Sequence, residues 1–172
     1  SIVQKLNEEQ VADTAASDEE AVLENKIAEY DAFLTKQDPA FTVEELEEAM
    51  QKVMDQYAGG IGTHYQFNEK QLAMAEEKIK KLQILAKGLA AADMHELMFI
   101  YELKERLTVC LTVIAHLRAR KETRWHSFAE NLDYPEKSDA WLCYVNSKKN
   151  GDQITMIRRD LVKGGETYEH RD

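Results

Sequence analysis

Apolar residues recur every three or four positions along most of this chain, a spacing that predicts amphipathic helices. A polar residue able to cap a free backbone N–H precedes each of the four patterned stretches, at Ser17, Thr42, Asn68 and Asp93. A glutamate lies three positions after the first, second and fourth of these residues, which predicts three capping boxes. We therefore expect four helices, which end at Asp38-Pro39, at Gly59-Gly60, near Leu89 and near Lys121.

The last of these stretches, roughly residues 94–121, is apolar around much of its circumference. A helix of this kind is usually buried on several sides, so we expect it at the centre of a bundle. The four helices together predict a mainly α fold, an antiparallel three-to-four-helix bundle.

After Pro135 the period changes from helical to strand-like. Residues 141–147 and 153–159 are rich in strand formers, and Asn150-Gly151 lies between them. Asn-Gly is a strong hairpin signal because both residues of the tight turn need positive φ. We expect a small C-terminal β-hairpin over 141–159, with Leu142 and Tyr144 on one strand and Ile154 and Met156 on the other able to cover the bundle.

The composition of the chain narrows the classes of function that it can have. The formal charge is −10, from 32 acidic and 22 basic residues. This charge argues against a nucleic-acid partner and favours a soluble protein or a surface that meets a basic partner. No apolar run approaches the ~20 residues of a membrane span, and no secretory signal opens the chain, so we expect a cytoplasmic protein. Cys110 and Cys143 form no CxxC pair, and we expect free thiols, no metal and no cluster.

Two short motifs suggest chemistry that their context argues against. The glycines at 59, 60 and 62 follow a predicted helix, whereas a dinucleotide fingerprint needs a strand before the glycines and a helix directly after. A helix end and a turn are therefore favoured over a phosphate cradle. His95-Glu96 begins like the zinc motif HExxH, but Phe99 stands where the second histidine belongs.

A basic cluster stands out in this acidic chain, at Arg106, His116, Arg118, Arg120 and Lys121. Cations at a helix C-terminus complement the helix dipole, which is the favoured interpretation; binding of a carboxylate, sulfate or phosphate is the alternative.

The loop that follows carries the candidate site. Arg124, Trp125 and His126 can orient an anion or pack against another domain. Alternatively Glu122 and Arg124 pair internally while Trp125 fills the end of the bundle. In either case we expect the guanidinium of Arg124 to pair with a carboxylate, from Glu122, Glu130 or Asp133.

Several sequence segments point to one family. They are Glu122-Thr123-Arg124 with Asp133-Tyr134-Pro135, Asp93 to Leu97, Arg106 to Cys110, and Trp141 to Ser147. Over roughly residues 42–165 the chain resembles the C-terminal helical domain of the fumarate reductase/succinate dehydrogenase flavoproteins, and within them most resembles the adenylylsulfate reductase alpha subunits. It departs from the family where Gly62 replaces an arginine and Trp125 replaces a glycine, so no histidine role is transferred to His126.

The resemblance implies a parent FAD-dependent oxidoreductase with an iron–sulfur partner subunit. The flavin and the main substrate residues would lie in a flavin-binding domain of the same polypeptide, outside these residues. This chain would then hold no cofactor and no catalytic residue, and would support the flavin domain and the subunit interface. The residues implied at a substrate or domain interface are Arg124, Trp125, His126, Asp133 and Tyr134.

We expect two regions, an acidic N-terminal helical arm over 1–40 and the flavoprotein-like bundle with its hairpin over 41–172. The alternative to a flavoprotein domain is a free-standing acidic helical-bundle interaction protein. A homodimer of the isolated flavoprotein domain is possible.

Overall fold

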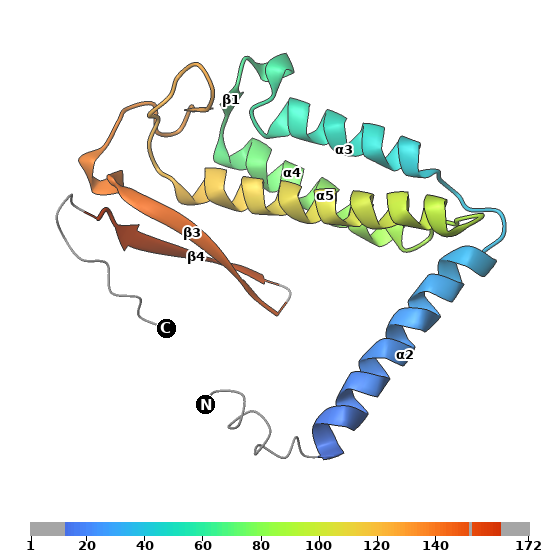
Figure 1. Cartoon of the computed structure of the whole chain (residues 1–172). Helices are drawn as coiled ribbons and strands as arrows, with labels where there is room; N and C mark the ends of the chain where they lie inside the picture. The colour runs from blue at the N-terminus through green and yellow to red at the C-terminus, as the bar shows by residue number, and fades with distance from the viewer. Residues whose placement is uncertain (1–12, 152, 163–172) are drawn as a thin grey trace.

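The computed structural model describes residues 13–151 and 153–162 (Figure 1). Within them the α-helices are α2 Asp13–Thr35, α3 Val43–Tyr57, α4 Glu69–Ala86 and α5 Met94–Ala119. The strands are β1 Gln66–Phe67, β2 Glu130–Asn131, β3 Cys143–Asn150 and β4 Gln153–Asp160. Two 3₁₀ turns complete the order, Ile61–Thr63 and Asp139–Trp141. The mainly α fold with a C-terminal hairpin is confirmed.

Local capping sets the starts of the three bundle helices. Thr42 and Glu45 form the predicted capping box of α3. Asn68 forms one with Gln71 at the start of α4. At α5 the Asp93 carboxylate accepts from the backbone N–H groups of residues 95 and 96, but the Glu96 carboxylate accepts from the N–H of Ala92 instead of that of Asp93. The predicted reciprocal box at Asp93 is therefore only half formed.

The predicted start at Ser17 is wrong. Helix α2 is already continuous from Asp13 and runs through residues 17–20 without a break. Ala15-Ala16 are the strongest helix formers, so nothing before Ser17 stops the helix. The predicted end is confirmed: α2 stops at Thr35, and Asp38 takes a φ of 50°. Residues 1–12 of the predicted arm lie outside the described residues.

Helices α3, α4 and α5 run alternately up and down, with α4 antiparallel to its two neighbours, and they enclose the core (Figure 1). Their buried side chains are Leu46 and Met50 from α3, Leu72, Ala75, Ile79, Leu82 and Ala86 from α4, and Leu97, Ile100, Leu103, Leu107 and Ile114 from α5. Helix α5 contacts α2, α3, α4 and both hairpin strands, which confirms its central position.

The hairpin lies along α5 on the side away from α3 (Figure 1). Asn150 pairs with Gln153, so the turn begins at Gly151, where φ is 59°. The predicted turn was thus one residue too early. Residues paired across an antiparallel hairpin share a face, and Ser147 pairs with Met156 and Lys149 with Ile154, so Leu142 and Tyr144 lie on the opposite face from Ile154 and Met156. The expectation that all four cover the bundle together is therefore wrong. Cys143 and Val145 are half-buried with Ile154 and Met156, whereas Leu142 and Tyr144 are exposed.

Candidate functional site

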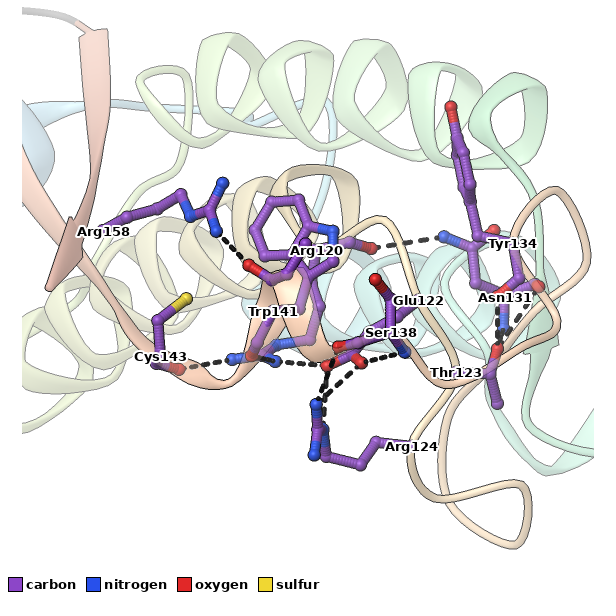
Figure 2. Close-up of polar contacts among 11 residues, drawn as sticks. Arg120, Glu122, Thr123, Arg124, Asn131, Tyr134, Ser138, Trp141, Cys143 and Arg158 are labelled. Carbon is purple, nitrogen blue, oxygen red and sulfur yellow. Dashed lines mark hydrogen bonds and ion pairs between the residues drawn. The ribbon is translucent and has the colours of Figure 1, made fainter. Parts of the chain in front are cut away.

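The segment from Arg120 to Leu142 connects α5 to the hairpin and contains the candidate residues (Figure 2). Its centre is Glu122, whose side chain is fully buried. Arg124 donates to Glu122 through Nε and Nη2, at 2.8 Å each, and Arg120 donates through Nη1 at 2.6 Å. The backbone N–H of Ser138 supplies a further bond of 3.0 Å. One carboxylate therefore ties together the start and the end of the connection.

Arg120 connects the same carboxylate to the hairpin. Its guanidinium donates to the carbonyl oxygens of Trp141, at 2.9 Å, and Cys143, at 3.1 Å. Arg158 on β4 donates to the carbonyl of Ala140 and stacks over the Trp141 ring at 4.3 Å (Figure 2). The hairpin is thus anchored to the C-terminal end of α5 by two guanidinium groups.

Thr123 closes the loop from inside. Its buried hydroxyl accepts from the backbone N–H of Asn131 and donates to the carbonyl of Tyr134, both at 2.9 Å. These bonds draw residues 123 and 131–134 together, and residues 124–130 form an outward loop between them (Figure 2).

The far side of the loop is attached to the start of α4. Strand β2 pairs in parallel with β1, through Glu130 N–H to Tyr65 carbonyl and Leu132 N–H to Phe67 carbonyl bonds. The Asp133 carboxylate accepts from the backbone N–H of Glu69 at 2.7 Å. Asp133, a predicted interface residue, is therefore a cap on the first turn of α4, where a negative charge complements the helix dipole.

The loop presents aromatic side chains to solvent. Trp125 is 68% exposed and Phe128 73% exposed. The interpretation in which Trp125 fills the end of the bundle is therefore wrong, although the internal Glu122–Arg124 pair that accompanied it is present. Exposed aromatic residues on a loop that is held at both ends are typical of a contact surface.

The remaining candidates, His126 and Tyr134, do not share a pocket with Arg124 and Trp125. His126 is exposed, with Nδ1 3.3 Å from a carboxylate oxygen of Glu130. The Tyr134 ring lies under the ammonium of Lys121 at 5.3 Å. A small pocket of 230 Å³ contains Arg124 and Trp125 but not His126, Asp133 or Tyr134. The five candidates share one loop without sharing one cavity.

Sequence reasoning left out Phe128 and the structural importance of Glu122 and Thr123. An apolar residue in the middle of a polar loop was the available signal for Phe128. The burial of Glu122 had no comparable local signal, because it depends on Ser138, 16 positions further along.

Internal pairing accounts for the cations at the end of α5. Arg118 donates to Glu69, at 2.5 and 2.8 Å, and to Glu76, both on α4. Lys121 lies 3.7 Å from Glu69. These carboxylates face the cluster from the neighbouring helix, so its charge is balanced without a bound anion.

The glycine run does not fit a flavin pyrophosphate. Helix α3 precedes it and a 3₁₀ turn follows, and the N–H of Gly62 donates to the Asp55 carboxylate at 3.0 Å. A carboxylate thus occupies the position that a phosphate would need, since a phosphate cradle requires free backbone N–H groups.

The zinc-like motif at His95-Glu96 likewise has a structural explanation in the contacts around it. The ring of His95 packs edge-on against that of Phe99, with centroids 4.8 Å apart. Among the residues that the structure describes, no group of three His, Cys, Asp or Glu side chains could hold a metal ion. None of the helices in the described ranges combines the length and hydropathy of a membrane-spanning segment.

The groups that bond to the Glu122 carboxylate shift its pKa strongly. Burial would raise the pKa of Glu122, but the bonds from Arg124, the Ser138 N–H and Arg120 outweigh it and lower the pKa to about 2. On α2, hydrogen bonds from Lys104 and Lys26 lower the pKa of Glu29 to about 2.

Acid should therefore destabilise the protein in a defined window. A carboxylate with a lowered pKa contributes its full stabilisation above the unfolded pKa of about 4.5 and loses it as pH falls toward 2. We expect the free energy of unfolding to drop between pH 5 and 2, with Glu122 responsible for about 3 kcal/mol. Urea unfolding across this range measures the loss. Glu122→Gln should flatten the profile, and an unchanged slope in that variant would contradict the assignment.

The fold and the site define a helical domain that carries an exposed aromatic loop, held at both ends, beside a hairpin anchored to α5. The family described as the fumarate reductase flavoprotein C-terminus matches residues 47–166. The chain belongs to this family, and the matched region agrees closely with the resemblance inferred from the sequence.

Individual similar proteins are consistent with this family. The adenylylsulfate reductase alpha subunit of Megalodesulfovibrio gigas is 34% identical over 98 residues, 56% of this chain and 15% of that protein. The structure of adenylylsulfate reductase from the hyperthermophilic Archaeoglobus fulgidus matches with a TM-score of 0.79 and 32% identity, over 87% of this chain and 26% of that chain.

Two further structures define the limits of the likeness. An adenosine-5-phosphosulfate reductase in complex with sulfite has a TM-score of 0.72 and 34% identity, over 83% of this chain and 24% of that one. An E. coli quinol fumarate reductase, at 19% identity and a TM-score of 0.69 over 91% of this chain and 26% of that one, shares the fold. The chain spans no more than about a quarter of each of these relatives.

Proposed function

We propose that this chain acts as the C-terminal helical domain of an FAD-dependent oxidoreductase of the adenylylsulfate reductase type, and that it docks on the flavin-binding domain through the loop 124–130. One observation carries the proposal: the loop is fastened at both ends by buried polar bonds, yet presents Trp125 and Phe128 to water. A loop held rigid before binding loses little entropy when it docks, and tryptophan is among the residues that contribute most to interfaces.

The other candidates support the same surface. Arg124 holds the loop through Glu122, and Asp133 holds it to α4. His126 is exposed beside the two aromatic residues and can contribute a polar contact at the rim. In this proposal the domain contributes support and no catalytic residue, and the FAD belongs to the flavin-binding domain of the same polypeptide in the parent enzyme. The parent passes electrons between the flavin and a small substrate, with an iron–sulfur subunit as partner, in the cytoplasm.

The test is binding to a flavin-binding region. An alpha subunit of adenylylsulfate reductase lacking its own C-terminal helical domain is mixed with this chain, and calorimetry measures the affinity. We expect the double variant Trp125→Ala/Phe128→Ala to weaken binding at least about tenfold with an unchanged melting temperature, because both side chains are exposed. Tyr144→Ala, which removes a half-exposed aromatic ring from the outer face of the hairpin, is the matched control.

Flavin content provides a second readout. The chain alone should purify without the absorbance of a flavin, and the mixture should keep its flavin through gel filtration. Absence of binding to the flavin-binding region would overturn the proposal and favour the free-standing interaction protein. A flavin retained by the chain alone would overturn its assignment as a domain without a cofactor.

A further inference from the structure

A second surface lies apart from the aromatic loop. A groove of 860 Å³ runs between the end of α2, the helices α4 and α5, and the tip of the hairpin. Its apolar lining includes Phe33, Ile84, Leu111 and Ile154. Its volume falls in the range of sites that bind ligands or side chains.

The rim of this groove is basic, although the protein carries a charge of −10. Among its lining residues that the structure describes, five are lysines and one is a glutamate: Lys80, Lys87, Lys104, Lys148, Lys149 and Glu29. Lys104 pairs with Glu29, and Lys80 with Glu76. The other three lysines form no ion pair with any residue that the structure describes. The groove therefore favours an occupant that is both apolar and acidic.

Helix α2 has these two properties. Its side chains Tyr30 and Leu34 pack on the core, and the same stripe continues toward the N-terminus as Leu23 and Ile27, which are 60% and 49% exposed. Glu19, Glu20 and Glu24 are exposed beside that stripe. Figure 1 shows the N-terminal part of α2 leading away from the bundle, where Leu23 and Ile27 are exposed to solvent. A helix so poorly packed is marginally stable in water without a partner.

We propose that this chain forms a reciprocal dimer in which the exposed stripe of α2 from each copy docks in the lysine-rimmed groove of the other. The helix cannot fill its own groove, because its C-terminal end already forms one wall through Ala32 and Phe33 while the rest leads away. Two identical exchanges close into a two-fold dimer and leave neither surface open. The proposal uses neither Trp125 nor Phe128, so it stands or falls separately from docking to a flavin domain.

Complementary charge reversal tests the dimer. Sedimentation measures the mass of the wild-type chain, of an arm variant Glu20→Lys/Glu24→Lys, and of a groove variant Lys87→Glu/Lys149→Glu. We expect the wild type to dimerise and each variant alone to raise the dimer Kd at least about tenfold, because like charges then face each other. Mixing the two variants pairs reversed arm with reversed groove and wild-type arm with wild-type groove, so a heterodimer should form with near wild-type affinity.

All four substituted side chains are exposed, and circular dichroism should show that both variants stay folded. Salt should weaken the wild-type dimer, since the Debye length falls from about 10 Å at 0.1 M to about 3 Å at 1 M. A wild-type chain that stays monomeric up to about 100 μM, which corresponds to a binding free energy weaker than about −5.5 kcal/mol, would overturn the proposal. So would a dimer that either reversal leaves unchanged, or a mixture of variants that remains monomeric.

Discussion

Glu122→Ala is expected to lower the free energy of unfolding by about 3 kcal/mol, because removing one partner of a buried ion pair leaves the others unpaired. Here the carboxylate has no exposed surface and serves two guanidinium groups and the Ser138 N–H. The side chains of Arg120 and Arg124 are 32% and 20% exposed, so water compensates them partly and the loss falls at the low end of the usual range. For a chain of 172 residues the melting temperature should fall by roughly 6–12 °C.

Glu48→Ala is the matched control. Glu48 pairs with Lys52 at 2.6 Å, but both side chains are about two-thirds exposed, and solvent screens such pairs so that they contribute little to stability. Glu122→Gln keeps the shape and removes the charge, so it should fall between the two. Equal melting temperatures for the Glu122 and Glu48 variants would show that the carboxylate does not fasten the loop.

Local signals predicted the bundle well. Thr42 and Asn68 cap α3 and α4 as expected, because a cap involves residues only three positions apart. The same signal failed at Ser17, where the alanines before it let the helix continue. At the hairpin the sequence located the turn to within one residue. The face of the first strand was wrong for a separate reason: a two-residue turn pairs odd with even positions, so Val145, and not Tyr144, shares the face of Ile154 and Met156.

In the candidate site, too, contacts between sequence neighbours were predictable and contacts between distant residues were not. The Arg124–Glu122 pair was predictable, since the two residues are neighbours on one loop. The cap that Asp133 places on α4 was not, because it joins residues 64 positions apart. The parallel pairing of β1 with β2 has the same separation and involves two residues in each strand, too short a stretch to give a strand period. The exposure of Trp125 depends on these contacts between residues far apart in the sequence. Sequence reasoning therefore left open whether Trp125 is buried.

The second large effect is expected at Gly60. Gly60→Ala should destabilise the protein by about 3 kcal/mol, because an added Cβ would overlap the Cα of Asp55 and lie 2.8 Å from its carbonyl oxygen. The backbone there has a φ of −79°, which alanine adopts freely, so the cost comes from the close approach of two backbone segments. Relief of the overlap must shift the turn away from α3, and β1 follows that turn directly.

Urea unfolding monitored by tryptophan fluorescence measures the loss, and it also reports on Trp125, since β1 holds the loop through β2. Gly88→Ala is the control: a Cβ there meets only the Leu85 carbonyl oxygen, at 3.3 Å, and the change should stay within about 1 kcal/mol. If both substitutions were equally mild, the glycine would not be required for this contact. If Gly60→Ala is severe and also weakens binding to the flavin-binding region, the glycine turn acts on the aromatic loop through β1 and β2. That result would place the glycines of this chain among the residues that position its interface, a role unrelated to phosphate binding.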